Sequence, residues 1–435
     1  MDLAVSCALL LCHGIVPEGS LDDTLLWAEL GLDGTLRPVA GTLAVADCAR
    51  KAGCTTIVVA KENSGEANLI PGLDVLAVSG LPELVSHLRG ERPIKRGVSP
   101  SVELVPETGV HSDMADVRGL SVARLALEVM VAGGHNLLFH GPPGVGKTML
   151  ARRACGLFPT LDREAALEIT KIHDVARRRM CGRLLQNAPL RSPHHTVSAA
   201  GLLGGGSPPR PGEVSLAHRG LLFLDELPEF PRACIEGLRE PLEDGEVSIV
   251  RAGYACRFPA RFQLMAAMNP CPCGYLGHPE RACICSLSSI QRYQKKVSGP
   301  FMDRMDLVVP VTPVDPKTLG GQQQGESSAV IRARIVRARD RQERRLVGTP
   351  WRTNAEISAG NEAMQRLCPL TEKAAKMLES LTRSRALSPR AQHRLRRVAL
   401  TLKDLREVGD VNSRVEARFV AEAAHLRRLP DVGVG

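Results

Sequence analysis

Short apolar runs, bounded by glycine, proline or polar residues, predict the strands of a buried parallel sheet. The clearest runs lie within residues 136–139, 220–226 and 262–268. They are continuous rather than alternating, which is typical of strands that are covered on both faces. Helical patterns at residues 116–132 and from Lys147 onward flank the first run. This order predicts an α/β core in which helices pack on both sides of a parallel sheet.

The two ends of the chain have patterns of their own. Residues 1–92 mix short strands with helices and predict a small α/β domain, which a linker of proline, serine and charged residues at 93–112 joins to the core. The core spans residues 113–312, and a basic linker with a C-terminal α-helical lid occupies residues 313–435. In the first domain we expect strands at residues 36–39, 56–59 and 73–78 and helices at residues 42–51 and 82–88.

Composition narrows the class of protein. Hydrophobic residues make up 44% of the 435 residues, enough for packed cores. No apolar run reaches the roughly 20 residues that cross a bilayer, so we expect no membrane partner. The apolar N-terminal stretch has neither a basic flank nor a cleavage site, and we interpret it as a core helix. Thirteen cysteines without a secretion signal favour reduced thiols and a cytoplasmic location.

The first apolar run leads into a glycine-rich turn with a complete phosphate-loop pattern, G-x-x-x-x-G-K-[ST]. Such a turn points backbone N–H groups and a helix N-terminus at an anion. Lys147 can reach the β- and γ-phosphates of ATP, and the Thr148 hydroxyl can ligate Mg²⁺. A chance match is disfavoured because a strand and a helix flank the turn. The expected nucleotide-binding residues are Gly141, Pro142, Pro143, Gly144, Val145, Gly146, Lys147 and Thr148.

Two carboxylates end the second apolar run. Asp225 and Glu226 follow its last leucine, at the carboxyl end of the predicted strand. Ligands bind at this end of the strands in a parallel sheet. We therefore expect Asp225 to bind Mg²⁺ and Glu226 to polarise the attacking water. Two acids at a helix N-terminus are the alternative, which the phosphate loop nearby disfavours.

A cysteine cluster follows the third apolar run. Cys271, Cys273, Cys283 and Cys285 form the pattern C-x-C-x9-C-x-C. Four thiols that bracket a turn can bind Zn²⁺ with tetrahedral geometry. Unliganded thiols and a redox pair are the alternatives, and we favour zinc over both.

A segment rich in glycine, proline and serine, at residues 192–220, predicts an exposed insertion. It contains His194 and His195. No cysteine or histidine lies at ligand spacing from them, so we interpret both as surface histidines rather than as metal ligands.

Six motifs in this order resemble the magnesium-chelatase-like AAA+ ATPases, and most closely the ComM/YifB family. The motifs span residues 141–399, more than half of the chain. The segment RPVAGTLAVADCARKAG resembles the Lon-protease-like domain of that family, whose first half we expect to be missing, through truncation or a misplaced start codon. Leu43 stands where the Lon lysine would be, so we expect no peptidase activity. The motifs are GPPGVGKTML, SPHHTVSAAGLLGGG, GLLFLDELPEF, AAMNPCPCGY, SGPFMDRMDL and LSPRAQHRLRRVA.

The resemblance implies further roles. Asn269 matches the sensor that orients the lytic water, and Arg304 matches an arginine finger that reaches the γ-phosphate of a neighbouring subunit. Arg390 matches the sensor arginine of the helical lid. The family resemblance also implies a homo-hexameric ring that uses ATP and Mg²⁺ and acts on single-stranded or branched DNA, as in branch migration during natural transformation.

A predicted hairpin at residues 247–258 supplies the candidate DNA contacts Arg251, Tyr254 and Arg257. Arginine can neutralise phosphate and tyrosine can stack on a base. The alternative is that the tyrosine packs inward and the arginines pair with acidic residues at 243–246. Residues 313–435 hold 24 of the 56 Lys and Arg but 14 of the 47 Asp and Glu, so the excess positive charge lies there. That excess is consistent with binding of a polyanion such as nucleic acid. A helical surface exposed to solvent is the alternative.

Two other functions compete with a DNA motor. One is a magnesium-chelatase motor subunit that remodels a partner protein, which explains the AAA+ core but not the Lon-like segment or the cysteines. The other is a non-catalytic interaction protein, which the complete set of ATPase residues disfavours. Stimulation of ATP turnover by DNA would separate a DNA motor from a chelatase subunit.

Overall fold

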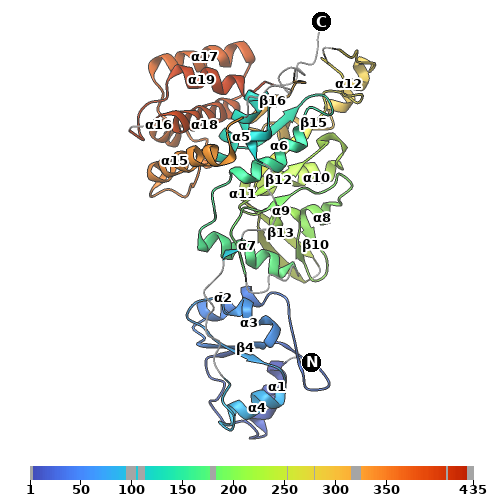
Figure 1. Ribbon diagram of the computed structural model, residues 1–435, viewed down its shortest axis with the longest axis vertical. Coiled ribbons are helices and arrows are strands. Elements are labelled where there is room, and N and C mark those ends of the chain that lie inside the picture. Colours follow the sequence, from blue (N-terminus) through green and yellow to red (C-terminus); the bar gives the residue numbers. More distant parts are fainter. Residues whose placement is uncertain are drawn as a thin grey trace. The chain divides into compact units, whose positions relative to one another are not determined.

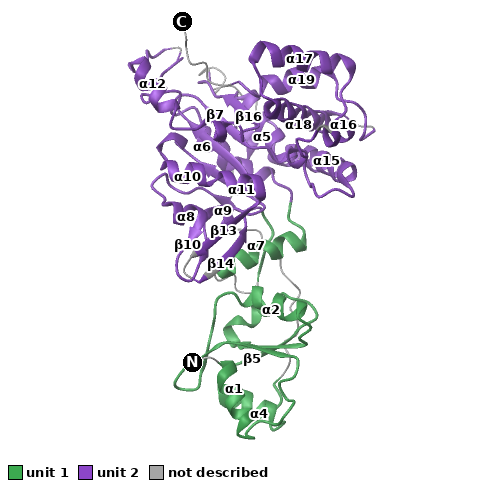
Figure 2. Ribbon diagram, turned by 180° about the vertical axis from the view of Figure 1, so that it is seen from behind, with its two compact units in different colours: residues 1–108, 160–187 green, residues 109–159, 188–435 purple. Residues whose placement is uncertain are grey.

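The computed structural model describes residues 3–94, 104–105, 113–176, 183–251, 253–278, 280–314, 325–407 and 410–428. The chain divides into two compact units (Figure 2). Unit 1 consists of Met1–Thr108 and Thr160–Asn187, and unit 2 of Gly109–Pro159 and Ala188–Gly435. Within the described residues, every helix is too short or too polar to cross a membrane.

Unit 2 is built on a five-stranded parallel sheet in the order β16-β7-β15-β12-β9. Strands β16, β15 and β12 of this sheet are labelled in Figure 1. The three apolar runs form its three central strands, so the predicted α/β fold with a parallel sheet is confirmed. The strands are β7 (Leu137–His140), β9 (Leu190–Arg191), β12 (Leu221–Leu224), β15 (Gln263–Met268) and β16 (Leu307–Pro310).

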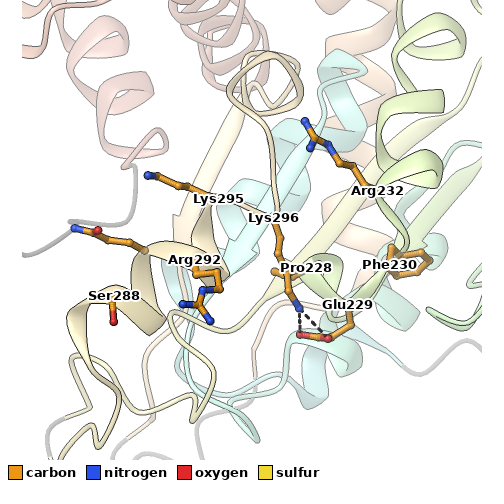
Figure 3. A pocket seen from close by; sticks show the side chains of 9 residues that line it. Pro228, Glu229, Phe230, Arg232, Ser288, Arg292, Lys295 and Lys296 are labelled. Atoms are coloured by element: carbon orange, nitrogen blue, oxygen red, sulfur yellow. Dashed lines mark hydrogen bonds and ion pairs between the residues drawn. The ribbon is translucent and has the colours of Figure 1, made fainter.

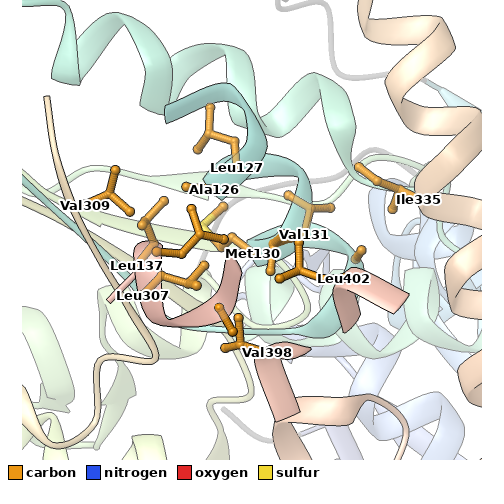
Figure 4. Packing of buried hydrophobic residues seen from close by; sticks show 14 of the residues in the cluster. Ala126, Leu127, Met130, Val131, Leu137, Leu307, Val309, Ile335, Val398 and Leu402 are labelled. Atoms are coloured by element: carbon orange, nitrogen blue, oxygen red, sulfur yellow. The ribbon is translucent and has the colours of Figure 1, made fainter. Parts of the chain in front are cut away.

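Successive strand residues point to opposite faces of this sheet. Leu137 and Phe139 belong to one buried cluster, which includes residues of α5, α15 and α18 (Figure 4). Leu138 belongs to a second cluster with residues of α8 to α11. Both faces are therefore covered, which is why the strands read as continuous apolar runs. The helices are α5 (Ser121–Gly133), α8 (Ala199–Leu203), α9 (Glu213–Leu216), α10 (Arg232–Gly237), α11 (Arg239–Asp244), α15 (Ser328–Leu346) and α18 (Pro389–Arg406).

Helix α5 begins later than the predicted start at residue 116. Gly119 and Leu120 both adopt left-handed backbone conformations, with φ of 70° and 31°, and separate α5 from a short 3-10 turn at Met114–Asp116. Gly134, with φ of 75°, ends the helix, as a glycine in this conformation commonly does. The apolar pattern located the helix, but backbone conformation sets where it begins.

The lid belongs to unit 2 and packs through α18, which contacts α5, α15 and α19. The Ser388 hydroxyl accepts a hydrogen bond from the N–H of Ala391, and Pro389 occupies the first turn, so the local sequence fixes the start of α18. The other lid helices are α16 (Asn361–Leu367), α17 (Glu372–Arg385) and α19 (Ala417–His425).

The arginine-rich helix α15 turns several of its cations inward. Arg334 pairs with Glu128 and Glu326, Arg339 donates to the carbonyl of Val131, and Arg345 pairs with buried Asp404. These contacts tie α15 to α5 and α18. Part of the excess positive charge of residues 313–435 is therefore structural.

Unit 1 contains a three-stranded parallel sheet in the order β1-β4-β5. The predicted strands at 56–59 and 73–78 and the helix at 42–51 are present. The predicted strand at 36–39 shortens to β3 (Leu36–Arg37), which pairs with β2 (Glu29–Leu30) outside this sheet. The elements are β1 (Thr24–Trp27), α2 (Thr42–Lys51), β4 (Thr56–Ala60), α3 (Ser64–Ala67), β5 (Asp74–Val78), α4 (Leu81–Leu88), α7 (Arg163–Val175) and a β6–β8 pair (Leu104–Val105, Leu184–Leu185).

Residues 160–187, which lie inside the core range 113–312 expected from the sequence, pack in unit 1. Their helix α7 contacts α2. The carboxylate of Asp174 accepts hydrogen bonds from the N–H groups of Gly41 and Leu43. Lys171 pairs with Asp47 at 2.5 Å. Burial raises the pKa of Asp174, and the two N–H donors counter that rise.

The N-terminal helix α1 (Leu3–Cys12) differs from the core helix expected from its composition. It buries Leu3, Ser6 and Cys7, whereas Leu9 is 56% exposed. The helix is apolar all round, but unit 1 covers only one side of it. A uniformly apolar sequence predicts burial without indicating which side is buried.

Candidate nucleotide-binding site

The phosphate loop connects β7 to helix α6 (Lys147–Ala154). Gly144 and Gly146 have φ of 80° and 94°, a region that favours glycine. At Gly141 a Cβ atom would lie 2.1 Å from the carbonyl oxygen of Val311, so only glycine fits between the loop and the end of β16. Backbone geometry thus explains the two glycines of the pattern, Gly141 and Gly146, and the additional Gly144 between them.

Lys147 is 8% exposed, and its ammonium group lies inside this loop. It donates to the carbonyl oxygens of Gly141 and Pro142, at 2.7 Å and 2.8 Å, and to Asn269 Oδ1 at 3.1 Å. Burial lowers the pKa of Lys147 to about 8, while the charges of Asp225 and Glu226 act in the opposite direction. The lysine is a buried cation whose contacts inside the loop are carbonyl and amide oxygens.

The side chains of Thr148 and Asp225 are in contact, although they follow different strands, β7 and β12. The Thr148 hydroxyl donates to Asp225 Oδ2 at 2.5 Å. Asp225 directly follows β12, and Thr148 lies in the first turn of α6. Hydroxyl and carboxylate oxygens are the ligands that Mg²⁺ prefers, so this pair fits a magnesium ion beside the phosphate loop.

Asn269 follows β15, the strand that lies between β7 and β12. Its side chain therefore stands between the phosphate loop and the acidic pair, within hydrogen-bond distance of Lys147. This is where a group that orients a water molecule near the γ-phosphate would have to lie.

Glu226 has a left-handed backbone, with φ of 54°, and its side chain is 54% exposed. His195 Nδ1 lies 3.5 Å from Glu226 Oε2, and the rings of His194 and His195 stack with centroids 4.0 Å apart. His195 is thus more than a surface histidine. It follows β9, which pairs with β12, so both residues leave the sheet at the same edge. This contact could not be expected from the sequence, because the two-residue strand β9 was not predicted.

Arg304 precedes β16 and lies at the amino ends of the parallel strands, which we call the amino edge of the sheet. The phosphate loop lies at the carboxyl ends, the carboxyl edge. Arg304 is 6% exposed, forms an ion pair with Glu243 and donates to the carbonyl of Pro300 at 2.7 Å. The backbone carbonyl of Arg304 accepts a hydrogen bond from the side-chain amide of Asn136, the residue just before β7. Arg304 therefore lies at the amino end of β7, whereas the phosphate loop follows its carboxyl end. Burial lowers the pKa of Arg304, and the nearby charge of Glu243 opposes that effect.

Three further arginines surround Arg304. The positive charges of Arg239, Arg394 and Arg390 each lower the pKa of Arg304. Arg390 is exposed in the first turn of α18. The structure therefore places Arg390 with Arg304, in a group of cations at the edge away from the chain's own phosphate loop.

The hairpin is present as β13 (Glu246–Arg251) and β14 (Tyr254–Pro259), with Arg251 opposite Tyr254. The side chains of Arg251 and Tyr254 lie outside the described part of the chain. The Arg257 side chain is 75% exposed, and its Nη1 lies 3.4 Å from Glu246 Oε1. The alternative pairing with an acid at 243–246 is thus present at Arg257, in an exposed ion pair of little strength.

The four cysteine sulfurs of residues 271–285 lie within 4.8 Å of one another. The Sγ atoms of Cys271 and Cys273 are 3.4 Å apart, and each lies 3.6 Å from Cys283 Sγ. All four cysteines are free thiols. A hydrogen bond from the N–H of Tyr275 is the main reason that the pKa of Cys273 falls to about 6.

A pocket of about 640 Å³ lies between the segment after Glu226 and helix α12 (Leu287–Gln294) (Figure 3). Lys296 pairs with Glu229 at 3.2 Å. Arg232, Arg292 and Lys295 add three more cations to its lining, so positive charge exceeds negative charge there. The sequence did not point to this pocket, because its two walls are about 60 residues apart in the chain.

Comparison with known families adds independent evidence. Residues 113–319 match the family described as magnesium chelatase, subunit ChlI, and residues 325–427 match its C-terminal family. Residues 1–63 match a family described as subunit ChlI of Mg-chelatase.

Individual relatives match over most of the chain. It is 38% identical to the YifB protein of Escherichia coli, over 98% of this chain and 82% of that protein. It is 37% identical to the competence protein ComM of Haemophilus influenzae, over 93% of this chain and 78% of that protein. An uncharacterized protein of Mycobacterium tuberculosis is 42% identical, over 93% of this chain and 79% of that protein.

Proposed function

The chain belongs to the ComM/YifB family of magnesium-chelatase-like AAA+ proteins, and we propose on this basis that it is an ATP-hydrolysing ring motor acting on DNA. Family membership supports an AAA+ motor that uses ATP and Mg²⁺. The observation that carries the proposal is the convergence of Lys147, the Thr148–Asp225 pair and Glu226 at one edge of the sheet.

The proposed reaction is hydrolysis of ATP to ADP and phosphate. The loop N–H groups and Lys147 would bind the β- and γ-phosphates. Thr148 and Asp225 would hold Mg²⁺, whose chemistry here would be to neutralise phosphate charge. Glu226 accepts a proton from the attacking water. The water oxygen bonds to the γ-phosphorus, and the bond from that phosphorus to the β–γ bridging oxygen breaks. Asn269 orients that water.

We propose that each active site is completed by a second subunit. Arg304 and Arg390 lie at the edge opposite to their own phosphate loop, so the nucleotide that suits them belongs to a neighbouring chain. Acids pair with three of the four arginines: Glu243 with Arg304, Glu236 with Arg239 and Asp306 with Arg394. Arg390 is exposed, and the group as a whole favours an incoming polyphosphate. A closed ring, here a hexamer, lets every subunit both donate and receive these arginines.

We propose two DNA contacts. The hairpin carries Arg251, Tyr254 and Arg257, and the basic pocket carries Arg232, Arg292 and Lys295. Helix α15 is a weaker candidate, because contacts with α5 and α18 already occupy several of its arginines. Phosphate binding by exposed cations is strongly dependent on salt.

The test of the motor is ATP turnover with and without single-stranded or branched DNA, together with the mass of the assembly. Stimulation by DNA in a ring-sized assembly supports the proposal. A monomer with full, DNA-independent turnover would refute both the ring and the DNA role.

The test of the DNA contacts compares two double variants, Arg251→Ala with Arg257→Ala and Arg292→Ala with Lys295→Ala. Each pair should weaken DNA binding and flatten its salt dependence while leaving ATP turnover without DNA intact. Arg383→Ala, which removes an exposed cation on α17, is the control. Unchanged DNA affinity at several salt concentrations would eliminate the surface concerned.

A second candidate function is a chelatase-type motor subunit that remodels a partner protein. The match of residues 113–319 to the magnesium chelatase subunit ChlI favours it. Such a motor would respond to its protein partner rather than to DNA, so the DNA titration also distinguishes these functions.

Unit 1 is proposed to be Lon-like in fold but without peptidase activity. Leu43, at the position expected for a catalytic lysine, is fully buried in the apolar cluster of α2, β4 and β5. An apolar residue there cannot activate a nucleophile. The many free thiols suit a cytoplasmic protein, which is the location we propose.

A further inference from the structure

The cysteine loop, residues 271–285, begins two residues after Asn269 and carries four sulfur atoms on one side of a turn. In a tetrahedral ZnS₄ site with Zn–S bonds of about 2.3 Å, neighbouring sulfurs lie about 3.8 Å apart. The distances of 3.4 Å and 3.6 Å between Cys271, Cys273 and Cys283 are close to that value. Cys285 Sγ completes the group within 4.8 Å of the other sulfur atoms.

Backbone donors are directed at these sulfur atoms. The N–H of Cys273 points at Cys285 Sγ, at 3.4 Å, and the N–H groups of Tyr275 and Ile284 point at Cys273 Sγ. Such donors orient metal-bound thiolates and offset their charge. A disulfide would need sulfurs about 2.0 Å apart, far closer than any pair here.

We propose that Cys271, Cys273, Cys283 and Cys285 bind one structural Zn²⁺ ion and that the metal-bound loop braces the phosphate loop of the ATP site. Binding forms four Zn–S bonds and releases the protons of those cysteines that are still thiols, with no change of oxidation state. The proposal that the cysteine loop braces the phosphate loop rests on the proposed ATP site. The proposal that the four cysteines bind zinc does not depend on that site.

Packing connects the cysteine loop to the phosphate loop. Gly274, with φ of 83°, lies so close to Pro143 that a Cβ atom would be 2.7 Å from Pro143 Cδ. The residue just before the loop, Pro270, accepts a hydrogen bond from Gln294 of α12 at 3.1 Å. Asn269 contacts Lys147 directly. Fixing the turn at Gly274 therefore fixes one wall of the phosphate loop.

The first experiment measures metal in the purified full chain and then removes it. We expect about one zinc per chain, and cobalt substitution should give the thiolate-to-cobalt absorption of a tetrahedral S₄ site. Chelation under reducing conditions should weaken ATP binding on the order of tenfold, and added Zn²⁺ should restore it. A chain that is folded, metal-free and unable to take up zinc overturns the metal site, and stoichiometric iron overturns the choice of zinc.

The second experiment separates the brace from the metal. Gly274 and Gly277 both have positive φ, but a Cβ atom would meet Pro143 only at Gly274, whereas nothing lies within 4 Å at Gly277. Gly274→Ala should keep its zinc and bind ATP more weakly, whereas Gly277→Ala should keep both. Equal ATP affinity of the two variants, or unchanged affinity in the chelated protein, overturns the brace.

A third comparison keeps this inference apart from the proposed function. Lys147→Ala should bind ATP about 10- to 100-fold more weakly and retain zinc, so a failed ATP site remains distinguishable from a failed metal site. Cys256→Ser, which changes a cysteine outside the loop, is the control for thiol loss. Cys283→Ser should lose zinc, and circular dichroism establishes whether that variant is folded.

Discussion

The carboxyl and amino edges of the five-stranded sheet differ in the groups that they present. At the carboxyl edge, Lys147 is balanced by oxygens and carboxylates, and Thr148 already contacts Asp225. At the amino edge, Arg304 pairs with Glu243 and lies near the positive charges of Arg239, Arg390 and Arg394. One edge is organised for a nucleotide and a cation, whereas the other has excess positive charge. This contrast is the basis of our proposal that the amino edge of one subunit faces the carboxyl edge of the next.

The largest expected effect comes from removing the amino-edge cation. Arg304→Ala should lower ATP turnover by about 10³-fold or more, because an arginine finger stabilises charge in the transition state. Nucleotide binding to the chain's own phosphate loop should remain. Turnover and ATP affinity are measured side by side, with Arg383→Ala as the exposed-arginine control.

Mixed subunits sharpen the same test, because Arg304 is buried and its loss could also disturb folding. Arg304→Ala subunits keep the phosphate loop, and Lys147→Ala subunits keep the arginine. A mixture of the two should regain turnover that neither has alone. Wild-type turnover by Arg304→Ala alone would show that the two edges do not cooperate.

The next effect concerns the carboxyl edge. Glu226→Gln should still bind ATP but hydrolyse it about 10²- to 10⁴-fold more slowly, because the amide cannot accept the proton of the attacking water. Glu229→Gln, which changes a nearby acid in the basic pocket, should keep wild-type turnover without DNA. If Glu226→Gln turned over ATP like the wild type, another group would have to be the base.

Lys147 gives a smaller effect with a characteristic pH dependence. Lys147→Ala should weaken ATP binding on the order of 10- to 100-fold, as expected for loss of a charged hydrogen bond. Because burial lowers the pKa of Lys147 to about 8, the ammonium is protonated below that pH and loses its proton above it. ATP affinity of the wild type should therefore fall as pH rises through 8.

Titration calorimetry between pH 7 and pH 9.5 measures this change. The Lys147→Arg variant keeps its charge in that range, so its affinity should depend less on pH. A wild-type affinity that is constant to pH 9.5 would mean that Lys147 stays protonated in the empty site.

The groups at the carboxyl edge could be identified from the sequence because each lies directly after one apolar run. The phosphate loop, the acids after β12 and the amide after β15 each adjoin an apolar run, and parallel strands bring such ends together. The sequence also predicted that the lid is helical, but not the bounds of its helices. The Ser388 cap at the start of α18 is a finding of the structure.

Other features depend on long-range packing and could not be predicted in this way. Helix α7 carries no local signal that it packs on α2 through Asp174. The apolar pattern of α1 does not show which side is left uncovered. The proximity of Arg390 to Arg304 and of His195 to Glu226 depends on how separate segments meet.

The smallest expected effect concerns His195, which links the insertion 192–220 to the carboxyl edge. Its ring nitrogen lies 3.5 Å from Glu226 Oε2, and both side chains are partly exposed, so the contact is worth at most about 1 kcal/mol. His195→Ala should free the Glu226 carboxylate and raise turnover without DNA by up to about fivefold, at unchanged ATP affinity. His194→Ala, which removes the stacked neighbour but not the contact, is the matched control. If both variants kept wild-type turnover, the insertion would not influence the carboxyl edge through this histidine.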